Sequence, residues 1–173
     1  MIRRVKGLNE IIQLLFYPVF LVATFCLTLI FIPKVLYKEY FIYGFLIGGL
    51  GDIVAVGLMQ NILGLMWFQN QGIFYVLKQM ALSPLCWTVT VMIFLYFLPT
   101  KRAFRYPYIL TWAALSLGYG YIVHNVGLFD FVPWLYPIPA YLIFLGWWSF
   151  ASWFFRKTSP LALDESATNL KGK

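Results

Sequence analysis

Long apolar runs separated by short polar connectors form the main pattern of this chain. A membrane helix needs about 20 apolar residues, because each residue of an α-helix advances about 1.5 Å and the hydrocarbon core is about 30 Å thick. The pattern predicts five membrane helices, at residues 11–32, 41–66, 81–98, 108–128 and 135–155. Proline, glycine or polar residues mark the connectors between them, as in Pro33-Lys34 and Gln69-Asn70-Gln71-Gly72.

The predicted fold is all-α, a polytopic transmembrane helical bundle that forms one domain over residues 1–157. Residues 158–173 are polar, and we expect a disordered tail there. The basic start of the chain followed by an apolar run resembles a signal peptide, but the run is long and Pro33-Lys34 ends it. We therefore expect an uncleaved span. The alternative is that this first helix is interfacial or re-entrant, which leaves four spans.

Composition agrees with a membrane protein. Of the 173 residues, 62% are hydrophobic and only 11% are charged, whereas a soluble domain carries about 25% charged residues. The formal net charge is +7. Because the basic residues are scattered over the span ends, we attribute this charge to topology and anionic lipid, and we expect no nucleic-acid partner. Cys26 and Cys86 both lie in apolar runs and are interpreted as packing residues.

The distribution of Lys and Arg predicts an orientation. If the amino terminus is outside, the outer side holds four basic residues, Arg3, Arg4, Lys6 and Lys78. The inner side then holds nine: Lys34, Lys38, Lys101, Arg102, Arg105, Arg156, Lys157, Lys171 and Lys173. Cytoplasmic loops are the ones enriched in Lys and Arg. The count favours an outside amino terminus and a cytoplasmic carboxyl terminus, although the basic start of the chain favours the reverse.

Asp52 is the only acidic residue inside the hydrophobic runs. An ionisable group at bilayer depth costs about 2.5–3.5 kcal/mol on insertion scales, so such residues usually serve a purpose. Gly44, Gly48, Gly51 and Ala55 follow at steps of four, three and four, which places them on one helix-packing stripe beside Asp52. Two interpretations stay open. Asp52 is either a hydrogen-bonded carboxyl that fixes helix packing or a ligand for a cation, proton or amine.

The fourth run contains the lone histidine, His124, and two tyrosines, Tyr119 and Tyr121. At about 1.5 Å per residue, His124 lies nearer the outer end than Asp52, so a direct contact needs helix tilt or a water molecule. The two tyrosines lie closer to the depth of Asp52. Further polar residues belong to the same outer end, and a polar vestibule that leads to Asp52 is our hypothesis for them: Gln60, Asn61 and Asn125 within the helices, and Gln69, Asn70, Gln71 and Asp130 in the connectors.

The chain contains no P-loop, HExxH, GxSxG, metal-ligand cluster or paired carboxylates. We therefore assign no catalytic residue and no metal ligand, and we leave the cofactor undefined. Trp147, Trp148 and Trp153 precede Arg156-Lys157 in the last run, and we interpret them as an anchor at the inner membrane surface.

Several short motifs carry a resemblance over residues 40–157: Gly51-Asp52, Pro84, Leu98-Pro99-x-Lys101, Ile109-Leu-x-Trp112, His124-x-x-Gly127-Leu-Phe and the final Arg156-Lys157. On these motifs the chain resembles an uncharacterised family of small five-span membrane proteins of Bacillus- and Clostridium-type bacteria. The resemblance implies a bacterial plasma-membrane location and a five-span fold, and it implies no known activity. Members of that family often carry an acidic residue in the fourth helix, where this chain has only Tyr119 to Asn125.

Three function classes follow. The first is a non-enzymatic accessory protein, a scaffold or small subunit of a membrane complex, whose partners are the bilayer and either its own copies or a larger assembly. The second is a binder or carrier of a small cation, proton or lipophilic molecule, centred on Asp52 with His124 as a gate or relay. The third is a lipid- or isoprenoid-processing enzyme that uses Asp52 and His124. The absence of catalytic motifs favours the first two.

Overall fold

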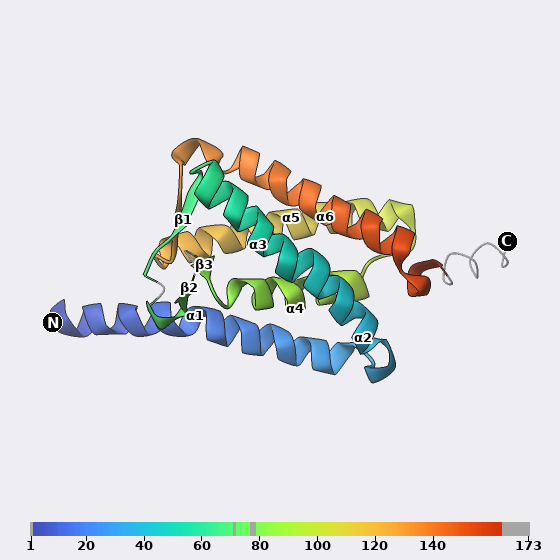
Figure 1. The fold of residues 1–173 in the computed structure, drawn as a ribbon, viewed down its shortest axis with the longest axis horizontal. Helices are drawn as coiled ribbons and strands as arrows, with labels where there is room; N and C mark the ends of the chain where they lie inside the picture. The colour runs from blue at the N-terminus through green and yellow to red at the C-terminus, as the bar shows by residue number, and fades with distance from the viewer. Residues whose placement is uncertain (1, 71, 77–78, 164–173) are drawn as a thin grey trace.

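Five helical rods run up and down along one long axis (Figure 1). The computed structural model describes residues 2–70, 72–76 and 79–163, with side chains from residue 9 onward. The rods are α1 (Ile2–Phe31), a composite second rod (Lys34–Ile62), α4 (Ser83–Tyr96), α5 (Arg102–Asn125) and α6 (Ile138–Thr158). The second rod consists of α2 (Lys34–Tyr43), a π-helical segment (Gly44–Leu50), α3 (Gly51–Val56) and a second π-helical segment (Gly57–Ile62).

Proline fixes several of the rod ends. α1 ends at Phe31, two residues before Pro33, because proline lacks a backbone N–H and disfavours helical backbone in the residue that precedes it. Pro33 then serves as the N-cap of α2, and Pro84 lies in the first turn of α4. The second rod begins at Lys34 rather than at residue 41, so most of the expected connector is helical.

Short strands close one end of the bundle, which the all-α prediction did not include. β1 (Met66–Phe68) pairs antiparallel with β4 (Phe129–Phe131), and β2 (Tyr75–Val76) pairs with β3 (Gln79–Met80). Single turns of 3-10 helix lie at Gly72–Phe74 and Pro133–Leu135. The β1–β4 pair lies at the left in Figure 1, opposite the end of α6. It joins the end of the second rod to the end of α5.

Among the described residues, three helices are long and apolar enough to cross a membrane: Asn9–Phe31, Lys34–Ile62 and Ile138–Thr158. The expected five spans are therefore not confirmed. α4 is apolar but has only 14 residues, and α5 has 24 residues but does not reach the same apolarity. Its tyrosines, its glycines and Pro107 lower its mean hydropathy.

The core lies between α4, α5 and α6. Trp148 of α6 is fully buried beside Phe94 of α4, with ring centroids 4.5 Å apart, and its indole Nε1 donates to Ser116 Oγ of α5 at 2.9 Å. The predicted interfacial anchor is thus wrong for two of its three tryptophans. Trp148 is a core residue and Trp147 faces a cavity, while Trp153 alone is exposed, at 57%. Aromatic area is buried here because α6 packs along α5.

The small-residue stripe packs against two neighbours rather than one. A Cβ on Gly44 would lie 2.7 Å from the Thr88 carbonyl oxygen of α4, and a Cβ on Gly48 would meet the Trp87 backbone. Gly51 instead faces the Trp147 ring of α6, and Ala55 lines the cavity. The π-helical segment is the reason, because its wider turn rotates the face that a strict α-helix would keep aligned.

The first residues of the expected tail, Thr158 to Leu163, are ordered in the structure. Ser159 and Ala162 are buried, the Leu163 N–H donates to the Ser159 carbonyl at 3.1 Å, and Ser159 Oγ donates to a Glu39 carboxylate oxygen of α2. These contacts hold the chain against the bundle as far as Leu163. Residues 164–173 lie outside the described residues.

Candidate ligand-binding site

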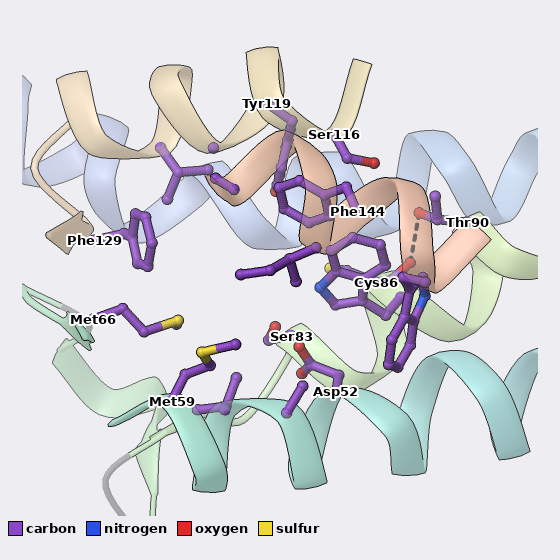
Figure 2. Close-up of a pocket in the computed structure, with 18 of the residues that line it drawn as sticks. Asp52, Met59, Met66, Ser83, Cys86, Thr90, Ser116, Tyr119, Phe129 and Phe144 are labelled. Carbon is purple, nitrogen blue, oxygen red and sulfur yellow. Dashed lines mark hydrogen bonds between the residues drawn. The ribbon is translucent and has the colours of Figure 1, made fainter. Parts of the chain in front are cut away.

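A cavity of about 380 Å³ lies between the helical rods (Figure 2). α1, the second rod, α4, α5, α6 and the β1–β4 end all contribute to its wall. Most of the lining is apolar or aromatic, and it includes Phe20, Met59, Trp87, Trp112, Phe129 and Phe144. Such a cavity, apolar with few polar groups, is the usual form of a small-molecule site.

Asp52 of α3 lies on the cavity wall and is 7% exposed. Gln79 Nε2 of β3 donates to Asp52 Oδ2 at 3.1 Å, and the side chain of Ser83, the first residue of α4, lies beside this carboxyl group. Figure 2 shows Asp52 and Ser83 close together at the cavity edge. Among the described residues that line the cavity, Asp52 is the only charged one. The carboxyl group therefore joins α3 to β3 and also faces the cavity.

Two buried polar atoms in the same cavity wall have no hydrogen-bond partner within the part of the chain that the structure describes, Tyr119 Oη and Trp147 Nε1. The Tyr119 ring packs on Phe20 with centroids 4.7 Å apart, and Figure 2 shows it on the wall opposite Asp52. Buried polar groups in native proteins are nearly always paired with protein, water or ligand. These two groups are therefore able to donate hydrogen bonds to acceptor atoms of a ligand in the cavity.

Tyr136 closes the wall at the β4 end of the cavity. Its ring stacks on Phe131 with centroids 3.9 Å apart, and its hydroxyl lies where a Cβ on Gly120 would be. Glycine at position 120 is what lets this ring approach α5. Burial, with a smaller contribution from nearby Tyr121, raises the pKa of Tyr136 to about 12, so its hydroxyl keeps its proton at neutral pH.

The structure brings Asp52, Tyr119 and Ala55 to the cavity and places the other predicted site residues elsewhere. Tyr121, Gln60, Asn61, His124 and Asn125 do not line it. Asn61 and Asn125 are exposed, and Tyr121 packs against the Tyr136 ring at 5.0 Å. Gln60 Oε1 accepts from the Phe68 N–H at 3.3 Å, so this side chain helps to fix β1.

His124 belongs to the β1–β4 end of the bundle rather than to Asp52. Its Nε2 lies 3.4 Å from Asp130 Oδ1, and its ring packs on Phe131 with centroids 4.7 Å apart. Asp130 also accepts from Gln69 Nε2 at 3.3 Å, and Asn70 Nδ2 donates to the Gly127 carbonyl at 2.8 Å. Of the residues of the hypothesised vestibule, Gln60, Gln69, Asn70 and Asp130 therefore contact strands and connectors at this end. Gln71 lies outside the described residues.

Sequence reasoning missed four of the residues described at this site, Gln79, Ser83, Tyr136 and Trp147. Ser83 precedes Pro84 at a helix start, which is a recognisable signal for a polar group at a helix N-terminus. Gln79 lies in a connector, and nothing local relates it to Asp52. Trp147 was assigned to the membrane surface because of its neighbours in sequence.

No model of a known protein family, no curated protein and no solved structure matches this chain. The resemblance to the small five-span family therefore stays a prediction. Among the described residues, no three His, Cys, Asp or Glu side chains gather as a metal site would require.

Proposed function

We propose that the protein binds a small lipophilic cation, such as an organic amine, inside the membrane, with Asp52 as its counter-ion. The observation that carries this proposal is the position of Asp52 on the wall of an otherwise apolar cavity of about 380 Å³. A bound cation stabilises the ionised carboxylate, and the faces of the surrounding tryptophan and tyrosine rings attract positive charge. The cavity volume falls in the range of about 300–1,000 Å³ that is common for ligand pockets.

The unpaired donors narrow the class of ligand. Tyr119 Oη and Trp147 Nε1 are each able to donate one hydrogen bond into the cavity. A ligand that carries a carbonyl or ether oxygen in addition to its amine satisfies both kinds of group. We therefore favour an amphipathic amine with an acceptor oxygen over a bare metal cation or proton.

We further propose that all five rods cross the plasma membrane of a bacterium, with the amino terminus outside. The up-and-down arrangement supports this topology, because Lys34, Lys38, Lys101 and Arg156 belong to elements at one end of the bundle. In this orientation the basic end is cytoplasmic, as the charge distribution favours. The expected accessory role in a membrane complex is compatible with ligand binding.

The test is equilibrium binding to the purified protein in mild detergent with two probes. Tetraphenylphosphonium carries a delocalised positive charge and no hydrogen-bonding group, whereas tetracaine carries an amine and an ester carbonyl. We expect Asp52→Asn to weaken binding of both probes by tenfold or more, because a charge-assisted contact in an apolar cavity is lost. The asparagine side-chain oxygen is still able to accept from Gln79 Nε2, so the fold is expected to persist, which a thermal melt checks.

The aromatic donors give an internal control. Tyr119→Phe and Trp147→Phe each keep a ring and remove a donor, so they should weaken tetracaine by about fivefold and leave tetraphenylphosphonium unchanged. The matched control is Trp134→Phe, since Trp134 is 62% exposed and lies outside the cavity wall. Unchanged binding of both probes to folded Asp52→Asn protein would sink the proposal and leave Asp52 with a packing role.

A further inference from the structure

A second cavity, of about 290 Å³, lies at the opposite, basic end of the bundle. It opens between α2, the end of α4 and the end of α6. Its wall combines apolar and polar residues, with Leu36, Leu95 and Leu161 among the apolar ones. Arg156, Thr100, Tyr40 and Tyr96 supply its polar lining.

Positive charge around this cavity has little compensation. Arg156 lies near enough to Arg105 of α5 for the two guanidinium groups to repel each other, and Arg102 adds to the repulsion on Arg105. Within the described part of the chain, Arg156 forms no ion pair and donates no hydrogen bond. Glu39 is the nearby acid on α2, and its carboxylate accepts from Ser159. A guanidinium group that lines a cavity, repelled by another and without a partner, is placed to bind an anion.

We propose that this cavity binds the phosphate-bearing headgroup of an anionic phospholipid, with Arg156 as the principal phosphate ligand. The planar guanidinium donates two parallel hydrogen bonds to phosphate oxygens. The leucines of the wall suit the first carbons of the acyl chains, which a free phosphate ion lacks. The helices end at this level, and Lys34, Lys38, Lys101 and Lys157 lie on the same end, where they attract an anionic leaflet surface.

This site is independent of the Asp52 cavity, because the two share no lining residue. The proposal therefore stands or falls separately from ligand binding at Asp52. Asp52→Asn should leave lipid binding at the basic end unchanged.

The experiment measures lipid affinity of the purified full chain by native mass spectrometry, together with the thermal unfolding midpoint, in the presence of phosphatidylglycerol, phosphatidylcholine or inorganic phosphate. We expect phosphatidylglycerol to bind and to raise the midpoint, with phosphatidylcholine weaker and phosphate alone without effect. Arg156→Gln should weaken phosphatidylglycerol at least fivefold. Arg156→Lys should restore part of the loss, since charge returns without the bidentate geometry.

The matched control is Lys157→Gln, which removes the same charge from the next residue, an exposed side chain that does not line the cavity. It should retain nearly all of the phosphatidylglycerol affinity. Equal losses in Arg156→Gln and Lys157→Gln would overturn the proposal in favour of diffuse surface charge. An equal rise of the unfolding midpoint with phosphate and with phosphatidylglycerol would show a site for free anions. Equal affinity for phosphatidylglycerol and phosphatidylcholine would show that the headgroup is not recognised. Either result would also overturn the proposal.

Discussion

At the scale of single residues, Asp52 both contacts a neighbouring element and faces the cavity, two placements that the sequence presented as alternatives. An acid in a hydrophobic run is conspicuous because of its insertion cost, and this identified Asp52 from the sequence alone. Its hydrogen-bond partner was not predictable, since Gln79 comes from a connector whose path depends on the whole fold. The carboxyl group contacts β3 and faces the cavity at once, so packing and binding need not exclude each other.

His124 shows the opposite outcome. A lone histidine near polar residues suggested a relay to Asp52. Residue spacing along one helix predicts how deep a side chain lies in the membrane, but it does not predict which residue of another element the side chain contacts. In the structure the neighbour is Asp130, with the two side chains 38% and 39% exposed. Such a half-exposed pair contributes little free energy. The residue that organises this end is Asp130, which contacts His124, Gln69 and the Phe131 N–H.

A prediction follows for this cluster. Asp130→Ala should lower the free energy of unfolding by about 1–2 kcal/mol, because it removes three polar contacts, whereas His124→Ala should cost less than about 1 kcal/mol. Thermal unfolding in detergent measures both, and hydrogen exchange should speed up in β1 and β4 only for Asp130→Ala. Neither variant should change tetraphenylphosphonium binding. Loss of that binding in His124→Ala would restore the relay hypothesis.

At the scale of elements, the second rod shows that the spacing of small residues predicts a shared helix face only while the helix is a regular α-helix. Steps of four, three and four predicted one stripe from Gly44 to Ala55, on the assumption of a uniform α-helix. The π-helical segment Gly44–Leu50 changes the turn within that stretch. As a result Gly49, which the step pattern omitted, packs against Thr88 Oγ1, while Gly51 faces α6. Glycine-rich backbone permits either turn, and the packing partner selects between them.

Glycine substitutions in this rod test the close packing on α4. A Cβ on Gly48 would lie 2.6 Å from the Trp87 carbonyl carbon and 2.9 Å from the Thr88 nitrogen, both backbone atoms that cannot move aside cheaply. Gly48→Ala should therefore cost about 1–3 kcal/mol of stability, despite the better helix propensity of alanine. A Cβ on Gly57 would meet no neighbouring group within 4 Å, so Gly57→Ala is the matched control and should gain up to about 1 kcal/mol. Thermal melts that rank the two variants in the reverse order would contradict the packing described here.

At the scale of the whole molecule, the five rods were predictable because long apolar runs and prolines act locally. The strand pairs were not, because β1 and β4 are three residues each and lie more than sixty positions apart in the chain. Length and composition alone do not decide whether α4 and α5 cross the membrane. The 14 residues of α4 extend about 21 Å, less than a hydrocarbon core of about 30 Å, and the polar residues of α5 weaken its own signal.

Single cysteines placed at three connectors test these two crossings separately. In a background with Cys26 and Cys86 replaced by serine, Ile73→Cys precedes α4, Lys101→Cys lies between α4 and α5, and Trp134→Cys follows α5; all three positions are exposed. If α4 and α5 both cross, a membrane-impermeant maleimide applied to intact cells reaches positions 73 and 134 but not 101, given an outside amino terminus. Equal labelling at 73 and 101 would mean that α4 does not cross, and equal labelling at 101 and 134 would mean the same for α5. Labelling at position 101 alone would mean that all five helices cross but that the amino terminus is inside. In that orientation position 101 lies outside and positions 73 and 134 lie inside.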